Sequence, residues 1–244
     1  MKMLVTRPLP EATETAARLR ALDIEPIVFP LLRFATLPTS LPDAQGFAAM
    51  ALTSANALRA LAEREHVERF RALKVFAVGD HTAEVARANG FTEVVSAGGD
   101  LADLAELLAH SRLSGPVFYP AARDQSGDLA KSLAPYGVMV VTARVYEMVS
   151  ADEMPDDLLA ALAAGAIGAA LFYSRRTAEV FIERAAAFHL PRAVKTRLGM
   201  LCISEQVASP LIEERFVRIG LADYPSEEGM MALALAFARD QNAS

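Results

Sequence analysis

The sequence predicts an α/β protein built from two similar domains, each with a parallel sheet. Short apolar runs alternate along the chain with segments whose apolar residues recur at helical spacing. Parts of the chain also repeat: LTSANA at 52–57 returns as FYSRRT at 172–177, and FAVGDHTA at 76–83 returns as LCISEQVA at 201–208. In each copy an apolar run ends on small hydroxyl or glycine residues before a helix-like segment. This pattern is typical of the ligand-binding edge of an open α/β sheet.

The composition sets limits on the protein class. A chain of 244 residues accommodates two domains of roughly 100–150 residues each. A hydrophobic content of 53%, a charged content of 22% and the absence of a signal peptide predict a soluble cytoplasmic protein. The net charge of −6 argues against a nucleic-acid partner, although a locally basic cleft could still bind a polyanionic small molecule. The longest uncharged stretch, 158–174, is shorter than the roughly 20 residues of a membrane-spanning helix.

The chain opens with a βαβ unit, whose strands are expected at 3–6 and 24–29 and whose helix is expected at 11–22. Pro8 and Pro10 lie in the first turn, where they interrupt no regular structure. Residues 31–37 then form an extended segment that leaves the first domain. Further strands are expected at 47–53, 75–79 and 94–96, and further helices at 55–65, 82–89 and 100–109.

The N-terminal pattern then returns, with a strand at 116–120, a helix at 128–134 and a strand at 138–146. Tyr136 and Gly137 are expected to cap this helical segment. A linker at 150–157 leads to the last elements, which are helices at 158–164, 177–188, 206–215 and 227–239 and strands at 169–173, 198–203 and 217–219.

The repeat allows two divisions into domains. A tandem division would cut the chain near Gly115. A discontinuous division would join 1–33 and 149–244 into domain 1, leave 38–142 as domain 2, and use 34–37 and 143–148 as interdomain linker strands. The residues alone are compatible with both divisions, although the composition of the linkers favours the discontinuous division.

Strand-to-helix turns supply the candidate binding residues. Ser54, in the turn before Asn56, and Ser174 are expected to be helix N-caps, and the free backbone N–H groups beside them suit a carboxylate. Neither turn has a glycine-rich phosphate loop, so nucleotide binding has little support. Gly79 is expected to allow a sharp turn before Thr82, whose hydroxyl at a helix start serves as either a cap or a ligand contact.

Four arginines follow the ends of predicted strands, and together they indicate an anionic ligand with several carboxylates; they are Arg7, Arg123, Arg175 and Arg176. Tyr146 ends a strand beside the presumed domain crossing, where a neutral phenol can donate a proton to a leaving oxygen. The histidines show no metal-ligand spacing, so no metal is expected. Cys202 lies within an apolar run and is expected to be a buried, unreactive side chain.

Six short segments taken in order resemble the uroporphyrinogen-III synthase family; they are TRP at 6–8, LTSANA at 52–57, VGDHTA at 78–83, VY at 145–146, FYS at 172–174 and PSEEGM at 225–230. The resemblance covers essentially the whole chain. It implies two flavodoxin-like α/β domains, the first built from both chain ends, joined by a two-stranded linker with the active site in the interdomain cleft. It therefore favours the discontinuous division.

The resemblance also implies an activity. Members are lyases (EC 4.2.1.75) that cyclise hydroxymethylbilane to uroporphyrinogen III in haem biosynthesis, inverting ring D and losing water without cofactor or metal. By this resemblance Tyr146 and Thr82 are the catalytic candidates. The expected substrate-binding residues are Arg7, Ser54, Asn56, Gly79, Arg123, Ser174 and Arg175. Val207 and Gly127 depart from the family pattern, and Arg123 is expected to substitute for an arginine that is common at the position of Gly127.

A second hypothesis is a non-catalytic two-domain sensor or binding protein for an anionic metabolite. Both hypotheses predict a ligand between duplicated domains. The absence of a secretion signal and of an appended DNA-binding motif counts against the second. We expect a monomer that acts on a small molecule, with no nucleic-acid or membrane partner.

Overall fold

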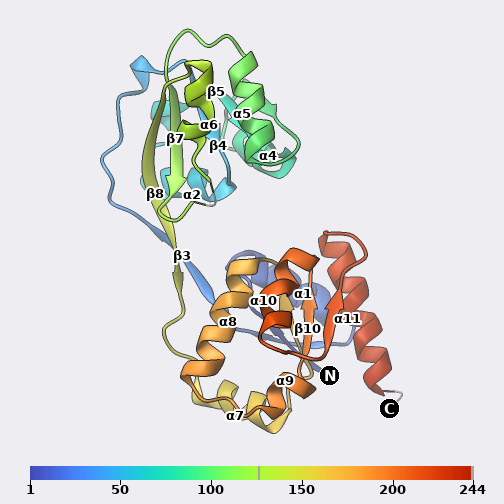
Figure 1. Ribbon diagram of the computed structural model, residues 1–244. Coiled ribbons are helices and arrows are strands. Elements are labelled where there is room, and N and C mark those ends of the chain that lie inside the picture. Colours follow the sequence, from blue (N-terminus) through green and yellow to red (C-terminus); the bar gives the residue numbers. More distant parts are fainter. Residues whose placement is uncertain (126, 243–244) are drawn as a thin grey trace. The chain divides into compact units, whose positions relative to one another are not determined.

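The computed structural model describes residues 1–125 and 127–242 (Figure 1). The chain divides into two compact units. Unit 1 contains Met1–Arg33 and Val149–Ser244, so both chain ends belong to it, and unit 2 is Phe34–Met148. None of the helices formed by the described residues has the length and apolar character needed to cross a membrane.

Unit 1 has a five-stranded parallel sheet of order β11-β10-β9-β1-β2. Its strands are β1 (Lys2–Val5), β2 (Glu25–Val28), β9 (Ala169–Phe172), β10 (Gly199–Cys202) and β11 (Ile219–Leu221). Its helices are α1 (Glu11–Ala21), α7 (Asp156–Ala164), α8 (Arg175–Ala187), α9 (Ala193–Arg197), α10 (Glu205–Glu213) and α11 (Glu227–Asn242). Strands β9 and β10 are buried at every residue, as expected where helices cover both faces of a parallel sheet.

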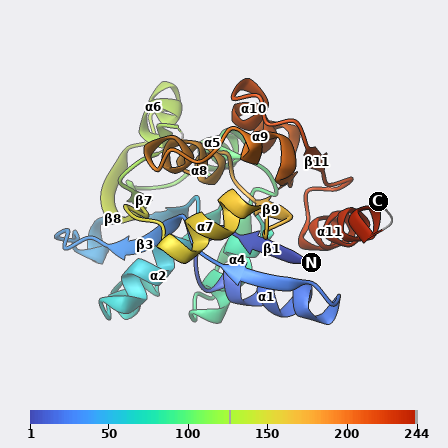
Figure 2. The same cartoon turned by 90° about the horizontal axis from the view of Figure 1, so that it is seen from below.

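Helices cover the two faces of this sheet. Leu19 of α1 and Met230 of α11 belong to one hydrophobic cluster with Val5 and Leu201 of the sheet. On the other face α8 packs against α10, and the Phe181 ring of α8 lies 5.4 Å from the ring of Phe172 on β9. Figure 2 shows α8 and α10 on the opposite side of the sheet from α1 and α11.

Unit 2 has a six-stranded sheet of order β3-β8-β7-β4-β5-β6. Its strands are β3 (Leu32–Thr36), β4 (Ala49–Leu52), β5 (Lys74–Ala77), β6 (Val94–Ser96), β7 (Val117–Ala122) and β8 (Val140–Ser150). Its helices are α2 (Ala55–Glu63), α3 (Val67–Phe70), α4 (Asp80–Ala88), α5 (Leu101–His110) and α6 (Leu129–Leu133), with short 3₁₀ turns η1 (Ala44–Gly46) and η2 (Ala134–Tyr136). Separate apolar clusters lie on the two faces, one around Phe118 and Phe70 and one around Phe76 and Leu104.

The two sheets have the same strand order once the chain is permuted. Counted in the order in which its strands appear, the unit 1 sheet reads 2-1-3-4-5, the flavodoxin-like order. The five parallel strands of unit 2 read 5-4-1-2-3, and counting from β7 and β8 first turns this into 2-1-3-4-5 as well. The repeat in the sequence therefore corresponds to a repeated sheet topology, with β7 and β8 as counterparts of β1 and β2.

Several elements differ from their predicted bounds. Strand β8 extends to Ser150, and β3 lies beside it at the edge of the sheet, so the expected linker segments 34–37 and 143–148 are counted with unit 2. The register between β7 and β8 shifts between Ala121 and Ala122, which pairs Ala122 with Tyr146. Helices α3 and α9 were not predicted. Gly137 is the C-cap of η2, as predicted, and has a left-handed φ of 71°.

Candidate functional site

Unit 2 contains a polar cavity where its strand order reverses. Successive connections run outward from β4 through β5 and β6, and outward in the other direction from β7 to β8. In open α/β sheets, ligands bind beyond the carboxyl ends of the strands at such a reversal. A cavity of about 210 Å³ lies there and is lined by Thr53, Ser54, Val78, Leu101, Tyr119, Ala122, Asp124, Gln125, Gly127 and Tyr146.

Tyr146 of β8 lines this cavity, and only 6% of its surface is exposed. Its ring stacks on Phe34, with centroids 5.6 Å apart and planes 25° apart. Burial raises the pKa of Tyr146, and a hydrogen bond with the Ser54 side chain lowers it in part. The phenol is therefore neutral at pH 7 and can donate a proton or a hydrogen bond.

Tyr119 and Thr53 also line the cavity and were not predicted as site residues. The Tyr119 hydroxyl lies 2.9 Å from Thr53 Oγ1, and 3% of the Tyr119 surface is exposed. Burial raises the pKa of Tyr119, the hydrogen bond with Thr53 lowers it, and the charge of Asp128 raises it. In the sequence, Tyr119 lies within the apolar run VFYP and Thr53 lies within the repeated motif LTSANA. Both positions are as typical of core packing as of a binding site, so neither residue was identified as a site residue.

Ser54 is the N-cap of α2, as predicted, and accepts a hydrogen bond from the Asn56 N–H at 3.2 Å. Ser54 lines the cavity, whereas Asn56 is absent from its lining. Ser174 caps α8 in the same way, accepting from the Thr177 N–H at 3.2 Å. The two repeated motifs therefore form equivalent helix starts, one in each unit.

Gly79 is the N-cap of α4, with a φ of −156°. This is extended backbone that any residue adopts, so the prediction that Gly79 is needed for a sharp turn was wrong. A Cβ built on Gly79 would have no atom within 4 Å. The space beside this helix start is open, and the N–H groups of its first turn have no helical partners.

Thr82 was expected near the start of a helix, but α4 already begins at Asp80. Thr82 is the third residue of this helix, is 6% exposed and does not line the cavity of unit 2. Within the described residues its hydroxyl makes no hydrogen bond. Val207 occupies the same position in α10 and is also 6% exposed, so the two side chains are buried alike.

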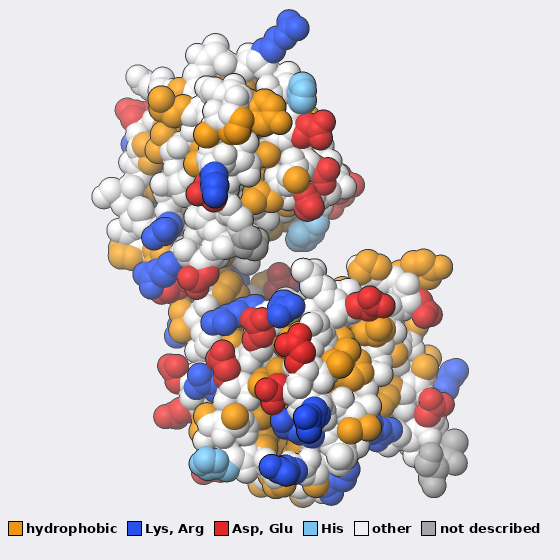
Figure 3. Space-filling model, viewed as in Figure 1, with side chains coloured by type: hydrophobic (Ala, Val, Ile, Leu, Met, Phe, Trp, Pro, Cys, Tyr) orange, Lys and Arg blue, Asp and Glu red, His pale blue; other side chains and the backbone are white. Residues whose placement is uncertain are grey.

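Three of the predicted anion-binding arginines are paired with glutamates. Arg123 pairs with Glu147, and the Arg175 Nε lies 2.9 Å from Glu179 within α8. Arg7 pairs with Glu227, with an N–O distance of 2.7 Å. On the face of unit 1 in Figure 3, basic and acidic side chains are interspersed in the same way. An incoming anion must therefore compete with these carboxylates for the guanidinium groups.

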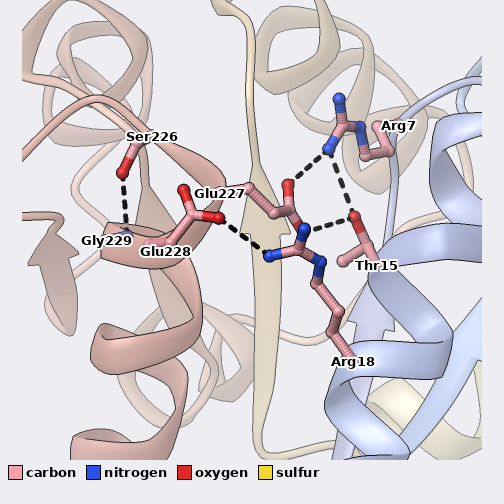
Figure 4. A network of polar contacts seen from close by, with 7 residues as sticks. All are labelled: Arg7, Thr15, Arg18, Ser226, Glu227, Glu228 and Gly229. Carbon is pink, nitrogen blue, oxygen red and sulfur yellow. Dashed lines mark hydrogen bonds and ion pairs between the residues drawn. The ribbon is translucent and has the colours of Figure 1, made fainter.

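The corresponding edge of the unit 1 sheet is filled by side chains (Figure 4). Arg7 Nη1 donates to Glu227 and, at 3.2 Å, to Thr15 Oγ1, and the Thr15 hydroxyl donates to Glu227 at 2.9 Å. The Arg7 guanidinium lies 4.1 Å above the ring of Tyr173. Burial and the Glu227 charge raise the pKa of Tyr173 well above its usual range. This network connects the first strand to the start of α11.

Cys202 is fully buried, and burial raises its pKa to about 12, which confirms the prediction of an unreactive side chain. Across residues 1–125 and 127–242, no three His, Cys, Asp or Glu side chains are grouped so that they could hold a metal ion. The polar side chains that line the unit 2 cavity are four hydroxyls, one carboxylate and one amide, from Thr53, Ser54, Tyr119, Tyr146, Asp124 and Gln125.

Comparison with known proteins gives one family and several structural relatives. Residues 13–232 match the family model HEM4, described as uroporphyrinogen-III synthase HemD. The structure is similar to uroporphyrinogen-III synthetase from Helicobacter pylori 26695, with 20% identity and a TM-score of 0.66 over 97% of this chain and 99% of that chain. It is also similar to a mutant uroporphyrinogen III synthase from Thermus thermophilus, with 18% identity and a TM-score of 0.61 over 100% of both chains. No curated protein matches the chain.

Proposed function

Because the chain belongs to the uroporphyrinogen-III synthase family, we propose that it cyclises hydroxymethylbilane to uroporphyrinogen III. The reaction closes a linear tetrapyrrole with inversion of ring D and loss of water, in tetrapyrrole biosynthesis. The family match over residues 13–232 is the observation that carries this conclusion. It also favours an enzyme over a sensor or binding protein. A cytoplasmic location follows from the biosynthetic role of the family.

Tyr146 is the proposed proton donor. As the C–O bond of the terminal hydroxymethyl group breaks, the hydroxyl takes the phenol proton and leaves as water, the pyrrole becomes an azafulvenium cation, and its N–H proton can return to the phenolate to give the neutral azafulvene. Ring D then attacks this electrophile through a spiro intermediate. The neutral phenol of Tyr146, in a cavity lined by hydroxyl groups, suits the first step. Thr82 is the second proposed participant, three residues after the open helix start at Gly79.

Binding of the substrate's eight carboxylates is proposed to involve helix N-termini and arginines. The starts of α2, α4 and α8, at Ser54, Gly79 and Ser174, each present backbone N–H groups that suit an anion. Arg7, Arg123 and Arg175 would contribute once a substrate carboxylate replaces the glutamate that each now contacts. The backbone N–H of Asn56 already donates to Ser54 Oγ, so Asn56 would contact the substrate through its side-chain amide.

Freshly made hydroxymethylbilane tests the function directly. The protein is expected to yield uroporphyrinogen III, whereas the uncatalysed reaction closes the ring without inversion and yields isomer I. Chromatographic separation of the isomers distinguishes the two. Formation of isomer I alone, at the rate seen without protein, would exclude the proposed activity.

A further inference from the structure

We propose that Tyr119 and Thr53 form a positioning pair that fixes the geometry of the unit 2 cavity around Tyr146. This inference rests on the proposed synthase activity and adds two residues to it. The pair connects the two strands between which the strand order reverses, because Tyr119 lies on β7 and Thr53 directly follows β4.

Backbone pairing between the two strands ends before they reach the cavity. Their backbone register pairs Ala49 with Val117 and Met50 with Phe118, and no pair follows, although β7 continues to Ala122. The Tyr119–Thr53 hydrogen bond of 2.9 Å lies just beyond this last pair. It therefore links the strands where backbone pairing has ended and sets the separation between two walls of the cavity.

The same bond acts on Tyr146 through the next residue of the chain. Ser54 follows Thr53, caps α2 and lines the same cavity as the Tyr146 side chain. A shift of Thr53 would therefore move the Ser54 hydroxyl relative to the phenol. Tyr119 and Thr53 thus act on the proton donor indirectly, and neither needs to contact the reacting atoms.

The pair also leaves one hydroxyl proton available. Tyr119 and Thr53 each carry one O–H, and their mutual bond uses only one of the two. Whichever residue donates, the remaining hydroxyl can donate to an oxygen atom of a ligand in the cavity. Unit 1 has no such pair, because Val5 and Tyr173 occupy the corresponding positions in the strand registers.

The conservative variant Tyr119→Phe removes the hydroxyl and keeps the ring. Loss of one neutral hydrogen bond is expected to lower kcat about 3- to 10-fold with little change in KM. Imprecise positioning is also expected to raise the share of isomer I above that of the wild type. Thr53→Ser keeps a hydroxyl and should restore most of the activity that Thr53→Val loses.

Tyr136→Phe is the matched control, because Tyr136 is 59% exposed and lies in η2, away from the cavity lining. The double variant Tyr119→Phe/Thr53→Val should lose less activity than the product of the two single losses, since both single changes remove the same shared bond. Thermal unfolding of all variants separates a loss of folded protein from a loss of turnover.

If Tyr119→Phe has the same kcat and isomer ratio as Tyr136→Phe, the proposed role of Tyr119 and Thr53 in positioning is wrong, while the proposed synthase activity is unaffected. If the wild type forms no isomer III, both proposals fail.

Discussion

At the scale of single residues, the chemistry of this protein depends on neutral hydroxyl groups. Tyr146 and Tyr119 are both nearly inaccessible, and burial raises the pKa of each. A buried phenol is a weak acid that stays protonated, which suits a leaving group that needs one proton at the moment of departure. Strong acids or bases at this place would add little to a reaction whose outcome depends on holding two ends of a substrate.

Tyr146→Phe tests the proton donor. Removing a general acid is expected to lower kcat by about 10²-fold, while packing against Phe34 is kept and the unfolding midpoint changes little. Turnover of hydroxymethylbilane and thermal unfolding measure the two effects. Tyr136→Phe serves again as the control on an exposed tyrosine. If Tyr146→Phe turns over substrate as fast as the Tyr136→Phe control, Tyr146 is not the proton donor.

Gly79→Ala tests whether a ligand approaches the start of α4. Its backbone is extended and a Cβ would meet nothing within 4 Å, so stability should change by less than about 0.5 kcal/mol. If substrate binds the backbone N–H groups there, the added methyl group raises KM several-fold. Gly229→Ala is the contrasting variant, since its Cβ would lie 2.3 Å from the Tyr224 carbonyl oxygen and should destabilise the fold. An unchanged KM in Gly79→Ala would argue against substrate contact at this turn.

At the scale of elements, the start of α11 is attached to the first strand and helix of unit 1. Glu227 contacts Arg7 and Thr15, and its neighbour Glu228 contacts Arg18 of α1. The first pair is mostly buried, with 23% and 21% of the side chains exposed, and the second is open to solvent. Glu227 and Glu228 are adjacent in the chain but differ in burial, so the stability effects of changing each one can be compared directly.

Glu227→Gln should lower the free energy of unfolding by about 1–3 kcal/mol, because it weakens charged hydrogen bonds to Arg7 in a partly buried site. Glu228→Gln should leave the unfolding midpoint unchanged within error, since exposed ion pairs contribute little. Urea unfolding of both variants measures the difference. Equal midpoints would mean that the Arg7 network does not stabilise unit 1.

Most strands and helices could be predicted from the sequence, but two short helices could not. Strand β6 has the predicted bounds, and α2, α4 and α8 begin within two residues of theirs. Helices α3 and α9 are too short to show helical periodicity.

The candidate site was only partly predictable, for a similar reason. Tyr146 and Ser54 belong to local motifs and were identified. The bond between Tyr119 and Thr53 joins residues 66 positions apart, and the Arg7–Glu227 pair joins residues 220 positions apart. Such pairings depend on which strands become neighbours in the sheet. A single sequence does not reveal that three of the four predicted arginines already have carboxylate partners.

At the scale of the whole molecule, buried acidic protons are distributed over both units. Tyr119 and Tyr146 lie in unit 2, Tyr173 and Cys202 lie in unit 1, and burial raises the pKa of all four groups. The unfolded chain therefore releases these protons at a lower pH than the folded chain does. At a pH where these groups have ionised in the unfolded chain but not in the folded chain, the folded state binds more protons than the unfolded state. In that range the free energy of unfolding falls as pH rises.

Urea unfolding between pH 8 and pH 11 should reveal this effect. The free energy of unfolding is expected to begin to fall near the ordinary cysteine pKa of about 8.5, because of Cys202, and to fall more steeply above the ordinary tyrosine pKa near 10. Tyr119→Phe should make the alkaline decline shallower, because one of the groups responsible is gone. The same slope in the variant and the wild type would contradict this assignment.

The interleaved chain also dictates an order of assembly during synthesis on the ribosome. Strands β1 and β2 are made first, but β1 needs β9 as its second neighbour, and β9 begins only at Ala169. Unit 2 has all its strands once Ser150 has emerged. The inserted unit can therefore close its sheet while the opening βαβ segment still lacks its partners. Strand β1 therefore leaves the ribosome before unit 2 does, yet it gains its second neighbour only after unit 2 has been made.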